Sequence, residues 1–468
     1  MKIAVIGGTA SGPAAAAEAV RTNPSAEVVL FEEGDHISVG ACEIPYFVAG
    51  RLEGEQDLQV LTAEAFERTR GATVQLRHRV HAIQPAQKRL VVEALRFGSR
   101  HEIPFDRFIL ATGARAHRLG VEGEEAAGVF TVRTYPDALA IKRWLDTEPV
   151  RHVVIVGGGF VGLEMAEATR DRGLRTTLLE PEGRVLPASL SKPLSAPLEH
   201  AVWEAGVRVR AERVTRIEAD SAGRVRAVRT DRGEIIGCGA VLVCIGVTPR
   251  SDLAASAGIR CHPSGAVAVD DEMRTSARTV WACGDVVAVP RIIDGVPVHW
   301  PLAPVGRRTA RVAARNASGA RPPDRFTGIT GAIAVRAFGV EAARVGLTLD
   351  EANAAGFDAL AADVQYWSRT RVYPGSRPLW ARLVVERRGG RILGGELVGS
   401  EGAALRADVL VPLVAAGATA KTLAEDLDLV YNPPVAPALD VLKVASAQAL
   451  RHMSGEPGKR SVRPRRGR

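Results

Sequence analysis

The sequence predicts an α/β protein with two doubly wound domains, each built on a parallel sheet, followed by a smaller α+β domain. An apolar strand, a glycine turn and a helix follow one another from Lys2, and the same succession returns from His152. Near residue 326 the pattern changes, and alternating strands such as Trp380 to Glu386 replace the glycine turns. A chain of 468 residues is long enough for separate cores of this kind.

The first unit begins with a strand from Lys2 to Gly8, which leads into a glycine turn and a helix from Pro13 to Val20. The next strand ends in Glu32, 20 residues past Gly12, where a carboxylate accepts the hydroxyls of a ribose. The unit therefore predicts a dinucleotide site at the helix N-terminus, although Thr9 replaces the second glycine of the usual pattern. The candidate residues are Gly7, Gly8, Ala10, Ser11, Gly12 and Glu32.

The second unit carries a complete GxGxxG pattern between a strand and a helix, from Gly157 to Gly162. Glu180 ends the following strand, 18 residues past Gly162. A carboxylate there accepts ribose hydroxyls and repels a 2′-phosphate, so we expect NADH to be preferred over NADPH. The candidate residues are Gly157, Gly159, Phe160, Val161, Gly162 and Glu180.

Two dinucleotide sites in one chain indicate a flavoenzyme, with FAD in the first domain and a nicotinamide cofactor in the second. Three later strand-like runs, at 108–114, 240–249 and 279–285, each lead into a turn that contains glycine and add residues to these sites. We expect the carboxylate of Asp285 to hold a hydroxyl of the flavin's ribityl chain. The runs contribute Ala111, Thr112, Gly113, Gly246, Gly284 and Asp285.

The composition, with 46% apolar and 24% charged residues, is that of a globular protein, and the sequence has no apolar run long enough to span a membrane. The N-terminal apolar stretch is interrupted by glycines, so we expect no signal peptide and a cytoplasmic protein. The net charge is +8, but residues 451–468 hold seven Lys/Arg and one Glu, which is six of the eight charges. We therefore expect a basic disordered tail and no nucleic-acid partner. The five cysteines are scattered, which predicts neither a disulfide framework nor a metal site.

Taken together, the motifs VIGGTASG, ILATGA, VIVGGGFVGLE, CIGVTP, WACGD and WPLAPVGRRTARVAARN resemble one family. It is the FAD-dependent pyridine nucleotide–disulfide oxidoreductase family. The resemblance is to its single-cysteine branch, which includes coenzyme A-disulfide reductases, NADH oxidases and peroxidases, and persulfide reductases. It implies a homodimer with an FAD domain at 1–117 and 263–325, an NAD domain at 118–262 and an α+β dimerisation domain at 326–450. It also implies cofactor contacts from Ser38, Leu302 and Ala303.

The resemblance also implies that Cys42 is the redox cysteine, because Ser38 to Cys42 matches the family's Ser-x-x-x-Cys segment. The two-cysteine members carry Cys-x4-Cys here and a late His-Pro-x-x-Glu, and neither pattern is present. Glutathione, lipoamide and mercuric reductases are therefore poor matches. The oxidases and peroxidases have a histidine where this chain has Ala10. Ile44-Pro45-Tyr46 instead resembles the Leu-Pro-Tyr of coenzyme A-disulfide reductases.

Two late segments around Tyr373 and Tyr431 also resemble coenzyme A-disulfide reductases, in which such tyrosines reach the active site, one from each subunit. The chain departs from that subgroup around the cysteine, where Ala41-Cys42-Glu43 replaces Asn-Cys-Gly. On the first helix Arg21 is retained, whereas Glu18 and Val20 replace basic residues that hold coenzyme A phosphates in relatives. These comparisons give Cys42, Tyr373 and Tyr431 as catalytic candidates and Arg21, Ser38 and Ala41 as substrate-binding candidates.

The function that we infer is the reduction by NADH of a low-molecular-weight disulfide or persulfide that is similar to coenzyme A disulfide. Electrons pass through FAD to Cys42, whose thiolate forms a mixed disulfide with the substrate. Cys42 needs a lowered pKa for this role, and Glu43 opposes the lowering unless its carboxylate points away. The alternatives are an NADH oxidase that cycles Cys42 through sulfenic acid and an electron-relay flavoprotein in which Cys42 is incidental.

Overall fold

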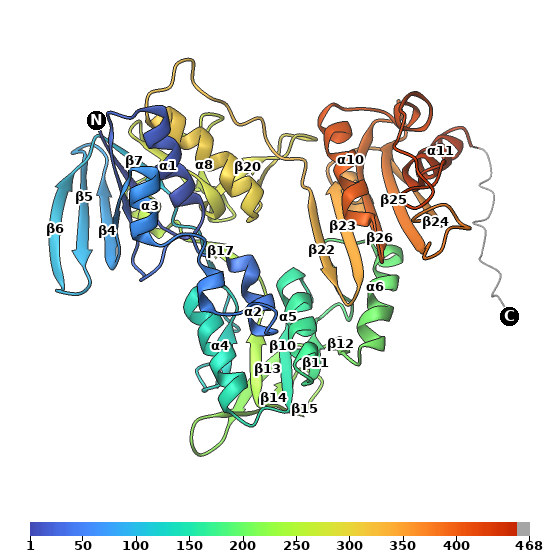
Figure 1. Ribbon diagram of the computed structural model, residues 1–468, viewed down its shortest axis with the longest axis horizontal. Coiled ribbons are helices and arrows are strands. Elements are labelled where there is room, and N and C mark those ends of the chain that lie inside the picture. Colours follow the sequence, from blue (N-terminus) through green and yellow to red (C-terminus); the bar gives the residue numbers. More distant parts are fainter. Residues whose placement is uncertain (456–468) are drawn as a thin grey trace.

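The first α/β domain is built on a five-stranded parallel sheet in the order β19-β7-β1-β2-β3. The computed structural model describes residues 1–455, and Figure 1 shows this domain at the start and middle of the colour scale. Its strands are almost wholly apolar because they lie in the core of the domain, buried between the elements packed against the sheet. The sheet strands are β1 (Lys2–Ile6), β2 (Glu27–Phe31), β3 (Thr73–Gln75), β7 (Arg107–Leu110) and β19 (Val280–Ala282).

Helices α1 and α8 pack against one another beside this sheet, and several short elements complete the domain. The helical segments are α1 (Ser11–Thr22), η1 (Ala41–Glu43), α2 (Ile44–Val48), η2 (Glu55–Leu58), α3 (Ala63–Arg70), η3 (Gly284–Val286) and α8 (Ala303–Ala317). The additional strands are β4 (His78–Gln84), β5 (Arg89–Ala94), β6 (Ser99–Pro104), β18 (Val267–Ala268), β20 (Val287–Pro290) and β21 (Pro297–His299).

The second α/β domain repeats the same plan, with a parallel sheet in the order β12-β11-β10-β16-β9. An antiparallel ribbon of three strands lies beside this sheet. The sheet strands are β9 (Val129–Thr131), β10 (His152–Val156), β11 (Arg175–Leu179), β12 (Arg208–Arg210) and β16 (Ala240–Val243). The ribbon is β13 (Val214–Ala219), β14 (Val225–Thr230) and β15 (Ile235–Gly237), and the helices are α4 (Tyr135–Thr147), α5 (Phe160–Asp171) and α6 (Lys192–Glu204).

The second domain is an insertion in the first, and the chain enters and leaves it through a two-stranded link. Strand β8 (Ala114–Ala116) pairs antiparallel with β17 (Val247–Pro249). Helix α7 (Asp252–Ser256) then packs against β4, and Ala254 and Ile259 belong to the core of the first domain. The chain thus returns to the first domain by about residue 250, earlier than the boundary expected at 262, because these apolar side chains find their core there.

The C-terminal domain has an antiparallel sheet in the order β22-β23-β26-β25-β24, with helices α10 and α11 packed against it (Figure 1). Its strands are β22 (Ile333–Ala337), β23 (Val340–Gly346), β24 (Ala359–Trp367), β25 (Pro378–Glu386) and β26 (Ile392–Gly399). Its helices are α9 (Leu349–Ala354), α10 (Ala403–Ala415), the short π-helix η4 (Thr422–Asp426) and α11 (Val441–Met453). Phe326 and Ile329, expected in this domain, instead join the core of the first.

Helix α11 continues to Met453, so the first residues of the segment expected as a disordered tail are helical. The rest of that segment, from residue 456, lies outside the described residues. Within residues 1–455 no helix is both long and apolar enough to cross a bilayer. Over the same range, no group of three or more His, Cys, Asp or Glu side chains is arranged to hold a metal ion.

Candidate active site

The first glycine turn lies tightly against the turn that follows β7. Gly7 has a φ of +106°, and a Cβ on it would collide with the carbonyl oxygen of Ala111. A Cβ on Gly12 would collide with the carbonyl oxygen of Gly7. The Glu32 carboxylate accepts the N–H of Gly8 at 2.6 Å and the N–H of Gly34 at 2.7 Å. Burial raises the pKa of Glu32 in spite of these hydrogen bonds.

The other residues predicted for the first site come together around this turn. A Cβ on Gly284 would collide with Ser11 Oγ, and the Gly284 N–H donates to Thr309 Oγ1 at 3.0 Å. Leu302 is the N-cap of α8, whose Gly306 also approaches Ser11 Oγ. The N-termini of α1 and α8 therefore meet at the carboxyl ends of β1, β7 and β19. Such a cradle, with Glu32 at its edge, fits the pyrophosphate and ribose of a dinucleotide such as FAD.

The loop that carries Cys42 is hydrogen-bonded to the first glycine turn. Ser38 donates its N–H to the carbonyl of Gly8 at 2.9 Å, and Val39 donates to the carbonyl of Thr9 at 3.0 Å. Ser38 has a φ of 55°, a left-handed conformation that is uncommon outside glycine and that turns the chain here. Cys42 follows in η1 with an exposed side chain. The cysteine is thereby placed beside the first dinucleotide cradle.

The charges around Cys42 come from several elements, and most of them are negative. Partial loss of water around the sulfur raises the pKa of Cys42, and the Glu43 and Glu164 carboxylates raise it further. Arg133, in the link between β9 and α4, lowers this pKa, whereas Asp285, with which Arg133 forms an ion pair, raises it. The protein's own groups therefore do not supply the lowered pKa expected for a reactive thiolate.

Glu164, Arg133 and Tyr46 lie near Cys42, and the sequence analysis assigned none of them to the site, although it noted the segment that contains Tyr46. Burial raises the pKa of Glu164 to about 7, and the neighbouring Glu167 adds to the shift. Burial and Glu164 likewise raise the pKa of Tyr46. A signal for Glu164 was present, because it is a carboxylate among buried apolar residues in the first turns of a nucleotide-binding helix. Tyr46 stands one helical turn past Cys42, but Arg133 offers no comparable local signal.

The second glycine turn has the same geometry as the first. Gly157 has a φ of +104°, and a Cβ on it would collide with the carbonyl oxygen of Cys244. A Cβ on Gly162 would collide with the carbonyl oxygen of Gly157. Glu180 Oε2 accepts the N–H of Gly158 at 2.8 Å, which places the carboxylate at the end of β11 against the turn. The turn fits a second dinucleotide, with Phe160 and Val161 opening α5 and Gly246 on the adjoining loop.

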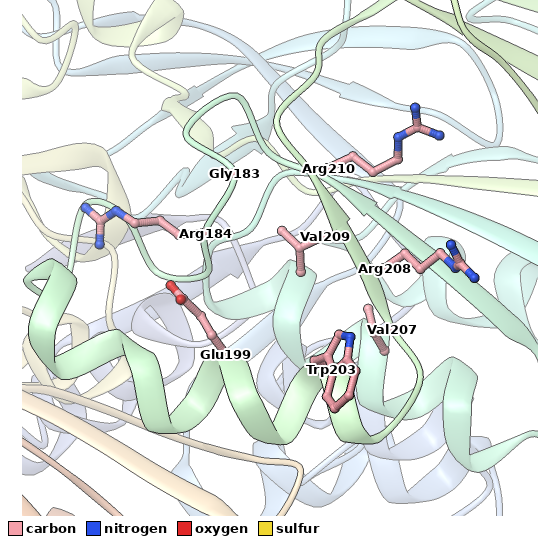
Figure 2. Close-up of a pocket in the computed structure, with 8 residues that line it drawn as sticks. All are labelled: Gly183, Arg184, Glu199, Trp203, Val207, Arg208, Val209 and Arg210. Atoms are coloured by element: carbon pink, nitrogen blue, oxygen red, sulfur yellow. The ribbon is translucent and has the colours of Figure 1, made fainter.

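Three arginines line a neighbouring pocket of about 360 Å³ between α6 and β12, and two of them, Arg184 and Arg210, lie on the loop and strand end near Glu180 (Figure 2). Arg184 donates to the carbonyls of Leu190 at 2.7 Å and Pro187 at 2.6 Å. Arg210 donates to Glu212 Oε1 at 2.7 Å. Figure 2 shows the two guanidinium groups at opposite sides of this pocket. Both are thus engaged by the protein rather than directed to the Glu180 carboxylate.

The two tyrosine segments lie side by side in the C-terminal domain. The Thr370 N–H donates to the carbonyl of Pro433 at 3.2 Å, which ties the loop that carries Tyr373 to the loop that carries Tyr431. Both tyrosines are exposed. This pairing does not fit the expectation that each subunit provides one tyrosine, because loops joined in this way present both side chains from the same subunit.

Arg21, a predicted substrate contact, lies near the C-terminal end of α1 and forms an ion pair with Glu18 at 2.9 Å. Glu18 is only 6% exposed and also lies 3.7 Å from Arg315 of α8. Ala41, another predicted contact, is half-buried next to Cys42. The structure thus separates Arg21 from the cysteine by most of the length of α1 and ties its charge to a buried carboxylate.

Comparison with known proteins agrees with this architecture. The family model described as pyridine nucleotide-disulphide oxidoreductase matches residues 1–315, and the model for the dimerisation domain of the same family matches residues 334–442. The NAD(P)H coenzyme A polysulfide/persulfide reductase of Pyrococcus horikoshii is 34% identical over 95% of this chain and 97% of its own length. The coenzyme A disulfide reductase of Staphylococcus aureus is 27% identical over 96% of this chain and 99% of its own.

Among solved structures, an NAD-dependent persulfide reductase from A. fulgidus superposes with a TM-score of 0.93 at 31% identity. The match covers 97% of this chain and 84% of the other. The shared fold thus extends over both α/β domains and the C-terminal domain. The chain belongs to the pyridine nucleotide-disulphide oxidoreductase family.

Proposed function

We propose that this enzyme takes electrons from NADH and delivers them through Cys42 to the disulfide or persulfide of a low-molecular-weight thiol. The observation that carries the proposal is one exposed cysteine on a loop hydrogen-bonded to the first glycine turn. The names of its relatives, which include persulfide and coenzyme A disulfide reductases, support this class of reaction. A lone cysteine is sufficient because the substrate supplies the second sulfur.

The enzyme is FAD-dependent, and the first cradle fits that cofactor. The groups that would hold it are the turn from Gly7 to Gly12, the Glu32 carboxylate and the α8 N-terminus, with Gly284 and Asp285 beside them. Bound FAD supplies the two-electron transfer between the nicotinamide and the sulfur. Glu180, with no free cation directed to it from Arg184 or Arg210, supports NADH as the preferred donor.

In the proposed cycle the Cys42 thiolate attacks one sulfur of the substrate and expels the other as a thiolate, which leaves a mixed disulfide. Two electrons from NADH then cleave this bond, so that one disulfide, one NADH and one proton give two thiols and NAD⁺. A persulfide consumes the same two electrons and gives a thiol and hydrogen sulfide. Tyr373 and Tyr431 protonate the leaving thiolate in this proposal, and their joined loops imply that they act together.

A homodimer completes the proposal. The C-terminal domain exposes apolar side chains around the two tyrosine loops, including Val372 at 90% and Val430 at 83%. Exposed apolar side chains gathered in this way are typical of a surface that another chain covers. We also propose a cytoplasmic location, which is supported by five cysteines that are all free.

The test compares Cys42→Ser with a matched variant, Cys261→Ser, which removes the other exposed cysteine. NADH consumption is measured against coenzyme A disulfide, coenzyme A persulfide, glutathione persulfide, cystine, polysulfide and oxygen. We expect Cys42→Ser to lose at least a hundredfold in turnover of disulfides or persulfides, whereas Cys261→Ser keeps it. Full turnover by Cys42→Ser would exclude the proposal, and rapid oxygen consumption without a thiol substrate would favour an oxidase.

A further inference from the structure

The side chain next to Cys42 in the sequence, Glu43, holds its carboxylate at the exposed surface of the cysteine loop. Both residues are exposed and consecutive in η1. Residues three apart eclipse one another in such a turn, and Glu43 accordingly folds back over Gly40, where any Cβ would collide with Glu43 Oε2. Within residues 1–455 the carboxylate of Glu43 has no hydrogen bond or ion pair. Its charge is therefore not neutralised by a neighbouring cation.

The remaining groups that face Cys42 do not reverse this negative charge. Tyr46 of α2 is neutral, Asp285 of η3 is a carboxylate, and Glu164 of α5, whose pKa burial raises to about 7, is mostly charged only above that pH. Arg133 is the cation among them, and its guanidinium is paired with Asp285. Among the neighbouring charges, Glu43 has the largest effect on the pKa of Cys42, and it is an exposed carboxylate next to the cysteine in η1.

Arg21, the predicted substrate contact that lies farther from the Cys42 sulfur, also offers little to an anionic substrate. Arg21 near the end of α1 is paired with Glu18, a buried carboxylate that also faces Arg315. A phosphate bound there would have to compete with Glu18 for the guanidinium. The Arg21 guanidinium is thus not free to receive a phosphate, although Arg307, Arg308 and Arg311 are exposed on α8, which packs against α1.

We infer that Glu43 is a specificity-determining residue, and that the Cys42 site selects disulfides or persulfides with a cationic group, such as a protonated amine, beside the sulfur. The part of this inference that concerns enzymatic turnover rests on the proposed function. The charge preference of the Cys42 thiolate does not depend on it. The reaction remains the one above, in which one disulfide, one NADH and one proton give two thiols and NAD⁺.

The charge preference is measured directly on the FAD-loaded enzyme with two methanethiosulfonate reagents, one trimethylammonium-ethyl and one sulfonatoethyl. The Cys42 thiolate attacks the thiosulfonate sulfur of either reagent and releases methanesulfinate, and the Cys261→Ser background removes the other exposed thiol. In water, a carboxylate about 7 Å from the reagent's charge speeds the reaction of the cationic reagent about threefold and slows that of the anionic reagent by a similar factor. The ratio of the two rates, cation to anion, therefore rises by roughly sevenfold to tenfold. We expect this ratio to exceed that of free 2-mercaptoethanol by about that factor, and to fall when salt screens the charges.

Glu43→Gln is expected to return the ratio close to that of the free thiol, and Glu43→Lys to invert it. Glu53→Gln is the matched control, because Glu53 is also exposed in the first domain. Turnover is then followed with cystamine, 2-hydroxyethyl disulfide and 3,3′-dithiodipropionate, which are expected in that order of kcat/KM. A wild-type ratio no higher than that of the free thiol, or one unchanged in Glu43→Gln, overturns the inference. Failure of the proposed function is a separate outcome, and it would appear as disulfide turnover that survives in Cys42→Ser.

Discussion

The buried Glu164 carboxyl should make the free energy of unfolding depend on pH, and Glu164→Gln should abolish that contribution. Burial raises the pKa of this carboxyl from 4.5 to about 7 in the folded enzyme. Between these two values the folded chain keeps a proton that the unfolded chain has already released. Raising the pH therefore favours unfolding, so this contribution to stability is complete below pH 4.5 and is lost as the pH rises through about 7. With about 1.4 kcal/mol per pKa unit, the full change is about 3 kcal/mol.

The measurement is urea unfolding of the FAD-loaded enzyme at intervals from about pH 5 to about pH 8.5, in wild type and in Glu164→Gln. Groups that titrate equally in both proteins cancel in the difference between their free energies of unfolding. Because glutamine does not ionise, Glu164→Gln should gain about 2.5 kcal/mol relative to wild type across this range, since a small part of the full change has already occurred by about pH 5. Glu53→Gln, at an exposed site, should show a flat difference. A flat difference for Glu164→Gln as well would refute the assignment of a buried, proton-holding carboxyl.

Three further variants test other parts of the site. Arg133→Gln removes the cation that lowers the pKa of Cys42, so the alkylation of Cys42 by iodoacetamide near pH 7.5 should slow about threefold to tenfold. Arg133→Lys, which keeps the positive charge, should recover the rate. An unchanged pH–rate profile in Arg133→Gln, or a rate that stays slow in Arg133→Lys, would contradict this role. Gly12→Ala places a Cβ on the Gly7 carbonyl oxygen and should yield protein without flavin absorbance, whereas Gly159→Ala, whose Cβ meets nothing within 4 Å, should keep its FAD. Glu180→Ala should reduce the kcat/KM preference for NADH over NADPH by about tenfold, and an unaltered ratio would remove Glu180 from cofactor selection.

The two dinucleotide cradles could be predicted from the sequence because their geometry is local. Close approach of Gly7 to Ala111 and of Gly12 to Gly7 requires glycine, so the requirement is visible as a residue type. The acidic residue at the end of the next strand follows from the fixed length of a βαβ unit. Glu32 accordingly reaches the Gly8 N–H, just as Glu180 reaches the Gly158 N–H.

The electrostatic surroundings of Cys42 could not be predicted in the same way. Arg133 and Glu164 reach the cysteine only because the second domain packs beside the loop of the first, and nothing in the spacing of the motifs encodes that approach. The joined tyrosine loops were equally hidden, since the hydrogen bond between Thr370 and Pro433 links segments about 60 residues apart. The early return of the chain to the first domain depends on which core accepts Ala254 and Ile259.

The insertion of the second domain also sets an order of events during synthesis on the ribosome. Strand β7 ends at Leu110, but its neighbour β19 begins only at Val280, 170 residues later. At about 5–20 residues per second, the edge of β7 waits roughly 10–30 s for its partner strand, and the α8 N-terminus arrives later still. The inserted domain, which is continuous in sequence, emerges complete within that interval. A nascent chain therefore has β7 paired with β1 on one side only, with its other edge exposed, and cannot yet close its flavin cradle, while the nicotinamide cradle is already whole.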